Sequence, residues 1–276
     1  MTKTFKYWQW RTIFATMIGY AIFYFVRKNF SFAIPGLTAE YGISKTSFGI
    51  IMTLVTVVYG ASRFLNGYLA DRFNARYHMA IGLLLCAAAN YAFGFGADLS
   101  YLITGESSGP QFVNTMVFIP PCNRLLTHWI PANELATKMS IWNTSHSIGA
   151  SIVAILCGYI MATMGQGAWK WCFWIPATIA LVGAIGIYIF LRDTPSSVGL
   201  PELHTINKKG KEGGAEYKAF LRKMVFRNKW IWILAIANFM VYIVRFAVLD
   251  WGPTFLKEAR GMSLANAGWT VAIFEI

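Results

Sequence analysis

The sequence predicts an all-α protein that crosses a membrane several times, and two observations carry this prediction. Of its 276 residues, 56% are hydrophobic and only 13% are charged, whereas soluble domains carry about 25% charged residues. Along the chain, apolar runs alternate with polar loops, and most runs approach the roughly 20 apolar residues that an α-helix needs to span a bilayer. The lipid bilayer is therefore the expected environment of the chain.

The apolar runs give the expected helices in order. A basic and aromatic segment, residues 1–11, comes first and is typical of an anchor at the membrane interface. The expected helices follow at residues 12–34, 48–69, 77–96, 139–163, 171–191 and 230–251, with a polar loop at 35–47 and a last apolar run at 264–276. A fourth crossing is expected within 112–126. This run is short and contains Asn114, Pro120, Pro121 and Asn123, so the fourth helix is expected to be abbreviated or partly absent.

Basic residues decide the expected orientation. They gather in the N-terminal segment, in the loops at 71–76 and 124–138, and in the long segment 192–229. Because positively charged loops stay on the cytoplasmic side, we expect a cytoplasmic N-terminus in a multi-pass protein of the cytoplasmic (inner) membrane. The net charge of +12 is explained by this topology and by anionic lipid, and no nucleic acid partner is expected.

The chain divides into three expected parts. They are an N-terminal transmembrane bundle at 1–191, a basic cytoplasmic linker at 192–229 and the start of a second bundle at 230–276. The last run, 264–276, is long enough for roughly two-thirds of a crossing at about 1.5 Å per residue. The sequence is therefore expected to be part of a longer protein and to lack half of the wall of a pore.

An internal repeat supports the second bundle, because four pairs of identical residues share one offset of 218 residues. The pairs are Tyr24 and Tyr242, Arg27 and Arg245, Pro35 and Pro253, and Glu40 and Glu258. A spacing near 200 residues fits one six-helix bundle with its loops. Transporters built from two such bundles bind substrate between them at the membrane midplane.

Four basic residues are expected at depth in the membrane, each with a polar residue three or four positions away on the same helix face. The pairs are Arg27 with Tyr24, Arg63 with Tyr59, His146 with Asn143 and Arg245 with Tyr242. Tyr20 extends the first pair, because residues at i, i+4 and i+7 share a face. Charge at this depth costs at least about 2.5–3.5 kcal/mol per residue, so it is rare and usually functional.

These residue types suit a phosphate. Two arginines offer planar forks to its oxygens, Lys28 adds a point charge, and tyrosine hydroxyls add donors. His146 titrates near neutral pH and is able to gain a proton as the anion arrives. The competing interpretation is internal pairing, but Asp250, near an expected helix end, is the only clear intramembrane acid and cannot neutralise several arginines. A neighbouring helix for Lys28, the cytoplasmic interface for Arg63 and simple packing for His146 remain alternatives.

The loop that follows the second expected helix has the pattern G-x-L-A-D-R-x-x-x-R between residues 67 and 76. Its defining positions are Gly67, Asp71, Arg72 and Arg76, which put an acid at a helix end and basic groups at the membrane surface. The pattern indicates either topology alone or a gating loop that pairs with neighbouring helices in one conformation.

Enzyme chemistry is not expected, because the sequence shows no nucleophile–base pair. The four cysteines are spaced without a metal-binding pattern and are expected to be packing residues. We therefore expect no metal and no cofactor.

The loop pattern at residues 67–76 is similar to the signature between helices 2 and 3 of the major facilitator superfamily. Together with GYAIFYFVRKNF (19–30), WNTSHSIGASI (142–152), RDTPSSVGLP (192–201) and VRFAVLDWGPTFL (244–256), it makes the chain resemble the organophosphate:phosphate antiporter family. The resemblance implies the major facilitator fold, here the first six-helix bundle with an abbreviated helix 4, helix 7 and part of helix 8. It also implies alternating access by a rocker-switch movement of two bundles.

The resemblance also implies site residues and an activity. The family's basic residues fall on Arg27, Arg245, Lys28, Arg63 and His146, and its pore-lining tyrosines on Tyr20, Tyr24, Tyr59 and Tyr242. The implied activity is exchange of a phosphorylated sugar, with glucose 6-phosphate favoured by general similarity, or of glycerol phosphate, for inorganic phosphate. The alternative is a membrane sensor of external sugar phosphate that signals to a partner kinase. A channel or a structural subunit fits the repeat and the charged midplane less well.

Overall fold

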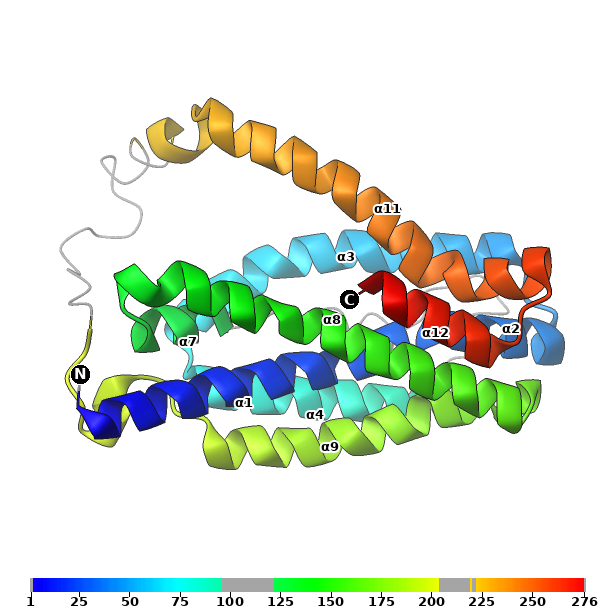
Figure 1. Ribbon diagram of the computed structural model, residues 1–276, viewed down its shortest axis with the longest axis horizontal. Coiled ribbons are helices and arrows are strands. Elements are labelled where there is room, and N and C mark those ends of the chain that lie inside the picture. The colour runs from blue at the N-terminus through cyan, green and yellow to red at the C-terminus, as the bar shows by residue number, and fades with distance from the viewer. Residues whose placement is uncertain (1, 96–121, 204–218, 220–221, 276) are drawn as a thin grey trace.

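The computed structural model describes residues 2–95, 122–203, 219 and 222–275, apart from the side chains of residues 63, 64, 68, 71, 166, 223 and 225. The regular elements in this part of the chain are helices (Figure 1). They are α1 (Lys3–Lys28), α2 (Phe30–Tyr41), α3 (Lys45–Arg72), α4 (Ala75–Gly94), α7 (Cys122–Trp129), α8 (Ala132–Thr163), α9 (Trp171–Phe190), α11 (Lys229–Arg260) and α12 (Leu264–Glu275), with short helical turns η1 (Gln166–Lys170), η2 (Pro195–Val198) and η3 (Arg222–Phe226). Within the described residues, five helices are long and apolar enough to cross a membrane.

The first crossing differs from the prediction at both ends and in the middle. Helix α1 begins at Lys3, where Thr2 caps it by accepting a hydrogen bond from the Phe5 backbone N–H (3.3 Å), so the expected anchor segment is helical. The helix stops at Lys28, and α2 continues to Tyr41 with Pro35 inside it. The predicted loop at 35–47 is therefore wrong. The loop starts only at Gly42, whose φ of +67° closes α2 in the left-handed conformation that glycine tolerates.

The other crossings are observed with shifted ends. Helices α3, α4 and α9 lie within a few residues of the predicted ranges, whereas α8 and α11 are longer because their polar and charged ends are helical too. The predicted loop at 124–138 is wrong in the same way, since it contains α7 and the start of α8. The expected crossing at 112–126 lies mostly outside the described residues.

Two buried asparagines hold the break between α1 and α2. Asn29 Nδ2 donates to Asn90 Oδ1 (2.8 Å) and to the Cys172 carbonyl (2.9 Å). Asn90 Nδ2 in turn donates to the carbonyls of Val26 (3.1 Å) and Cys86 (2.9 Å). Both asparagines are completely buried. This node therefore ties α4 and the start of α9 to the break through buried hydrogen bonds.

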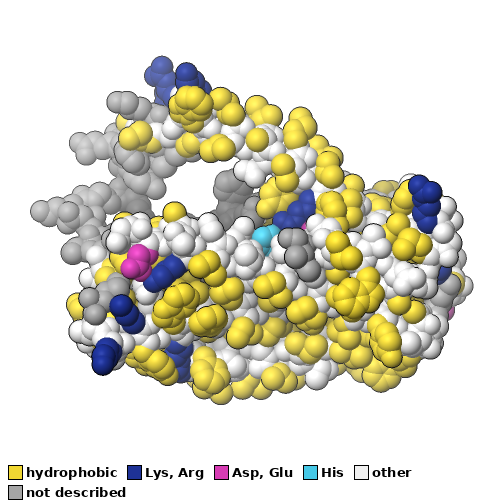
Figure 2. All heavy atoms as spheres, viewed as in Figure 1, with side chains coloured by type: hydrophobic (Ala, Val, Ile, Leu, Met, Phe, Trp, Pro, Cys, Tyr) yellow, Lys and Arg dark blue, Asp and Glu magenta, His cyan; other side chains and the backbone are white. Residues whose placement is uncertain are grey.

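The helices pack as a bundle with one element set apart. Helix α1 lies against α8 and α9, and α4 lies against α9, so that apolar side chains fill two buried clusters between them. Helix α11 meets α2 and α12 only near its C-terminal half, and its residues 229–244 are exposed (Figure 1). Hydrophobic side chains are widespread on the face shown in Figure 2, as expected of helices that face lipid.

Helices α8 and α12 touch through glycines. A Cβ atom at Gly158 would lie 2.5 Å from the Leu264 carbonyl oxygen, and one at Gly268 would lie 2.5 Å from the Ala154 carbonyl oxygen. Ser151 Oγ adds a hydrogen bond to the Ala272 carbonyl (3.0 Å). Small residues let membrane helices approach this closely, so the two bundles are in direct backbone contact here.

The repeat-related glutamates both lie at the end of the molecule where α2 and α11 finish. Glu258 forms an ion pair with Lys45 at the start of α3. Glu40 Oε2 accepts a hydrogen bond from Trp169 Nε1 (2.6 Å), and this bond lowers the pKa of Glu40 below its ordinary value. This end is therefore closed by contacts that join α11 to α3.

Candidate functional site

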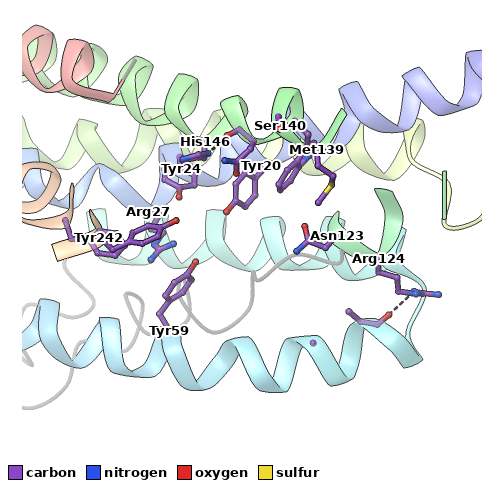
Figure 3. Close-up of a pocket in the computed structure, with 15 residues that line it drawn as sticks. Tyr20, Tyr24, Arg27, Tyr59, Asn123, Arg124, Met139, Ser140, His146 and Tyr242 are labelled. Atoms are coloured by element: carbon purple, nitrogen blue, oxygen red, sulfur yellow. Dashed lines mark hydrogen bonds between the residues drawn. The ribbon is translucent and has the colours of Figure 1, made fainter. Parts of the chain in front are cut away.

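A cavity of about 920 Å³ lies between α1, α3, α8 and α11 (Figure 3). Its walls include two arginines, one histidine and three tyrosines from the first bundle, and none of the fifteen residues that line it is acidic. The lining residues are Tyr20, Tyr24, Arg27, Tyr59, Gly67, Ala70, Asn123, Arg124, Met139, Ser140, Trp142, Asn143, His146, Tyr242 and Phe246. The described residues of the cavity wall therefore present hydroxyl groups and positive charge and include no carboxylate.

Aromatic rings form one wall of the cavity. Tyr20 packs between Trp142 and Tyr24, with ring centroids 4.9 Å and 5.5 Å away. Tyr24 lies 5.7 Å from the His146 ring. Figure 3 shows Tyr20 and Tyr24 together with His146 on one side of the cavity and Tyr59 on the opposite side. The i, i+4 spacing on α1 thus places both tyrosine hydroxyls on the cavity face.

Arg27 occupies the space between these walls. Its guanidinium carbon lies 3.8 Å from the centroid of the Tyr59 ring, a stacked cation–π contact. None of the five ion pairs formed by the described side chains includes Arg27. The contact with Tyr59 holds the guanidinium group of Arg27 at the cavity, where its planar fork is a suitable donor group for an anion.

Arg245 lies at the edge of the cavity and forms hydrogen bonds with Glu275 and His146. Its Nε donates to Glu275 Oε1 (3.0 Å), and its Nη2 donates to Glu275 Oε2 in a bidentate pair. Its Nη1 lies 2.8 Å from His146 Nε2. Because a guanidinium can only donate, His146 Nε2 must accept. The other ring nitrogen, Nδ1, then donates to the Asn143 carbonyl. His146 is therefore neutral in this arrangement.

Lys28 points away from the cavity, to the neighbouring helix α11. Its Nζ lies 2.6 Å from Asp250 Oδ1 and 4.7 Å from the centroid of the Phe246 ring. Both side chains of the pair are mostly buried, with 9% and 22% of their surface exposed. The pair connects the first bundle to the start of the second, which was the alternative that the sequence left open for Lys28.

Comparison with known proteins identifies the family of this chain. The model of the Major Facilitator Superfamily matches residues 16–276. The chain belongs to the major facilitator superfamily. It is similar to a probable hexose phosphate transport protein of Chlamydia pneumoniae (37% identity, covering 99% of this chain and 63% of the relative). It is equally similar to the glycerol-3-phosphate transporter of Bacillus subtilis (37% identity, covering 100% and 63%).

A third relative is the membrane sensor protein UhpC of Escherichia coli (33% identity, covering 99% of this chain and 62% of the relative). These relatives confirm the resemblance to the organophosphate:phosphate antiporter family. The chain spans about three-fifths of the length of the curated relatives it matches. The relatives named here are transporters or a sensor rather than enzymes.

The fold has a solved counterpart. The structure of a bacterial homolog to the human lysosomal transporter Spinster, in an inward-facing and unoccupied conformation, matches with a TM-score of 0.75 and 16% identity, over 100% of this chain and 60% of that one. The likeness shows the fold alone. The predicted all-α, multi-pass membrane architecture of the major facilitator type is confirmed.

The structure brings most of the predicted site residues to one place. Arg27, His146 and all five predicted polar pore residues (Tyr20, Tyr24, Tyr59, Asn143 and Tyr242) line the cavity of this major facilitator chain. Arg245 borders it through its contact with His146, and Lys28 is held by Asp250. The side chain of Arg63 lies outside the described residues. The roles of these residues in binding stay predictions.

The residues of the predicted gating loop have different surroundings in the structure. Gly67 lines the cavity, and Arg72 is exposed. Arg76 Nε donates to the Tyr188 carbonyl of α9 (2.6 Å) within the first bundle. The side chain of Asp71 lies outside the described residues. The gating role stays a prediction.

The acid partners of Lys28 and Arg245 were not predicted from the sequence, although Asp250 was recognised as an intramembrane acid. The expectation that Asp250 lies near a helix end is wrong, because α11 continues to Arg260, and Asp250 pairs with Lys28 inside it. Glu275, only 1% exposed in its side chain, was not considered, although it pairs with Arg245. The sequence signal for Glu275 is an acidic residue within the otherwise apolar run 264–276. Asn123 and Arg124 of α7 and Trp142 of α8 were also not predicted as cavity residues, although Trp142 lies four residues before His146 on the same helix face.

Proposed function

We propose that the full-length protein exchanges a phosphate ester, with glucose 6-phosphate as the favoured ester, for inorganic phosphate across the membrane by alternating access. The observation that carries the proposal is Arg27, which lies over the Tyr59 ring in a cavity whose described lining residues include no carboxylate. The cavity of about 920 Å³ falls within the range of roughly 300–1,000 Å³ that small-molecule sites occupy. The similarity to a hexose phosphate transport protein and a glycerol-3-phosphate transporter supports the same class of substrate.

The contacts suggest how an anion would be held. The phosphoryl oxygens accept hydrogen bonds from the guanidinium group of Arg27 and from the hydroxyls of Tyr20 and Tyr24, all of which line the cavity. Arg245 exchanges its bond to His146 for a bond to the anion. His146 Nε2 then loses its donor and becomes free to take up a proton, which adds a positive charge next to the phosphate. Proton uptake therefore accompanies anion binding.

The same contacts explain why exchange would be obligatory. Arg27 belongs to α1 and forms none of the ion pairs among the described side chains, so closing the cavity without an anion leaves its charge uncompensated in a medium of low dielectric constant. A phosphate between Arg27 and Arg245 of α11 offsets this cost and draws the two helices together. Both phosphate and its ester satisfy this requirement, whereas the empty site does not.

A transport assay on the full-length protein tests the proposal. Vesicles loaded with labelled phosphate are diluted into buffer that contains phosphate, glucose 6-phosphate, glycerol 3-phosphate or no transported anion. We expect fast release only with an anion outside, and the faster of the two esters identifies the preferred substrate. Equally fast release into anion-free buffer would show that exchange is not obligatory and would refute the mechanism.

A sensor is the second candidate, and the observation that favours it is the similarity to the membrane sensor protein UhpC. A sensor would keep the anion cavity and pass its occupancy to a partner kinase. The vesicle assay distinguishes the two functions. Binding of glucose 6-phosphate without any release of labelled phosphate, together with co-purification of a kinase, supports the sensor and excludes the exchanger.

A further inference from the structure

Three arginines from different elements meet at the C-terminal end of α9, away from the cavity. Arg11 Nε donates to the Phe190 carbonyl (3.0 Å), Arg76 Nε donates to the Tyr188 carbonyl (2.6 Å), and Arg192 Nη1 donates to the Leu191 carbonyl (2.7 Å). These carbonyls have no partner within the helix, and the helix dipole makes them electronegative. We call Arg11, Arg76 and Arg192 the arginine cluster. None of them lines the cavity.

Capping of the α9 carbonyls does not by itself account for the arginine cluster, because the three positive charges remain concentrated at the end of the helix. None of the five ion pairs among the described side chains includes a member of the arginine cluster. The nearest acid in the sequence, Asp193, is engaged by Arg124 (3.3 Å) and by the Ala75 backbone N–H (3.0 Å). Partial burial, followed by the charges of Arg76 and Arg11, lowers the pKa of Arg192. Among the described side chains, no carboxylate therefore forms an ion pair with these three groups.

Aromatic rings surround the arginine cluster. The guanidinium carbon of Arg11 lies 4.6 Å from the Trp8 ring and 5.2 Å from the Phe190 ring, and that of Arg76 lies 4.3 Å from the Tyr188 ring. The Phe190 and Tyr188 side chains are exposed. Basic and aromatic residues combined at the ends of membrane helices mark the level of the lipid headgroups. The left-hand end in Figure 2 accordingly shows dark blue side chains among hydrophobic ones.

The apolar surface next to the arginine cluster decides between a lipid and a free anion. Helices α4 and α9 pack side by side and leave large hydrophobic side chains exposed on their outer faces. They are Ile81, Leu84 and Leu85 on α4, and Val182, Ile185 and Ile189 on α9. A soluble phosphate would use only the arginines, whereas a lipid would also lay its acyl chains along this surface. The ligand that matches both features is a lipid.

We propose that the arginine cluster binds the phosphodiester headgroup of an anionic phospholipid, with the acyl chains lying along α4 and α9. The unused guanidinium donors contact the phosphodiester oxygens while each arginine keeps its bond to the end of α9. Basic pockets between membrane helices recognise such headgroups. Binding ties α1, α4 and α9 together at one membrane face and is independent of the proposed transport function.

Native mass spectrometry of the purified chain in detergent tests this site. The probes are phosphatidylglycerol, phosphatidylcholine with the same acyl chains, and inorganic phosphate. We expect phosphatidylglycerol to bind more tightly than phosphatidylcholine. An attraction of about 1 kcal/mol per basic residue corresponds to a factor of about five in affinity, so Arg76→Gln should weaken phosphatidylglycerol binding about fivefold. The combined Arg11→Gln, Arg76→Gln and Arg192→Gln variant should weaken it about 100-fold.

The controls separate charge from folding and lipid from free phosphate. The combined arginine-to-lysine variant keeps the charges and should bind within a few fold of the wild type. Arg260→Gln, at the exposed end of α11, should not change binding. If the combined glutamine variant does not fold, Arg76→Gln carries the test, because two caps on α9 remain. Unchanged phosphatidylglycerol binding in Arg76→Gln, equal binding of both lipids, or displacement of the lipid by inorganic phosphate would each overturn the proposal.

Discussion

At the scale of single residues, Arg27 shows why an arginine rather than any cation suits the cavity. Its planar group stacks on Tyr59 at 3.8 Å and still offers its donors to an anion. A lysine ammonium neither stacks in this way nor grips two oxygens at once. The stacked geometry therefore combines orientation with bidentate binding in one side chain.

The first prediction follows from this geometry. In the full-length protein, Arg27→Lys should weaken phosphate binding by about 10- to 100-fold, the loss expected for one charged hydrogen bond, and should reduce exchange to background. Equilibrium dialysis and the vesicle assay measure the two effects. The matched control is Arg72→Lys, an exposed arginine on α3, which should keep at least half of the wild-type binding. Wild-type exchange in Arg27→Lys would remove this residue from the site.

The site was partly readable from the sequence, and the missed part has a physical reason. Spacings of three and four residues placed Tyr20, Tyr24 and Arg27 on one face of one helix, and the structure keeps them together. Partners from different helices have no such rule. The pairs Lys28–Asp250 and Arg245–Glu275 depend on how α11 and α12 cross the rest of the bundle. The sequence therefore indicates the cations and the acid Asp250, but not which acid pairs with which cation.

Glu275 leads to the second prediction. Its carboxylate competes with an anion for Arg245, so Glu275→Gln should bind phosphate about fivefold more tightly, which corresponds to about 1 kcal/mol. The same substitution should slow exchange, because an arginine without its acid releases the anion less readily. Phosphate titration and the vesicle assay report these two effects separately. Weaker phosphate binding in a folded Glu275→Gln protein would show that the pair supports the site instead of competing with it.

At the scale of elements, helix ends were the least predictable feature. Hydropathy located five of the crossings, but the predicted ranges 139–163 and 230–251 are shorter than α8 and α11, whose polar and charged ends are helical too. The break at Asn29 gave no sequence signal either. Its cause is a set of hydrogen bonds to Asn90 and Cys172, which are distant in sequence. Tertiary contacts therefore decide what local propensity leaves open.

The third prediction concerns this break. Asn90→Leu removes the acceptor of Asn29 and the donor to the carbonyls of Val26 and Cys86. Leaving buried polar groups unpaired should lower the free energy of unfolding by about 1–3 kcal/mol. Because the break directly follows Arg27 and Lys28, phosphate binding should weaken as well. Circular dichroism melts in detergent measure the stability, with the exposed Asn266→Leu as control. Equal melting of both variants would show that the node does not stabilise the break.

At the scale of the whole molecule, the two ends of the helices differ. At one end α11 stands away from the bundle and its residues 229–244 are exposed, whereas at the other end Lys45 and Glu258 join α3 to α11. The glycine contact between α8 and α12 lies between these ends and keeps the two bundles in backbone contact. Among the described residues α11 is therefore joined to α3 at one end only, and under the proposed alternating access we expect Lys45 and Glu258 to separate.

The fourth prediction tests that separation. In the full-length protein, Lys45→Cys combined with Glu258→Cys should allow a short thiol cross-linker to join α3 to α11. Exchange should then stop, and reduction should restore it. The four native cysteines are buried, so the introduced pair should react first.

The matched control joins two positions on the same helix. Glu134 and Lys138 form an ion pair at i and i+4 on α8, so the pair Glu134→Cys and Lys138→Cys links residues that do not move apart. Exchange should continue after this cross-link. If fully cross-linked Lys45→Cys and Glu258→Cys protein also exchanges phosphate at the wild-type rate, the end closed by this ion pair does not open. Alternating access would then need another exit.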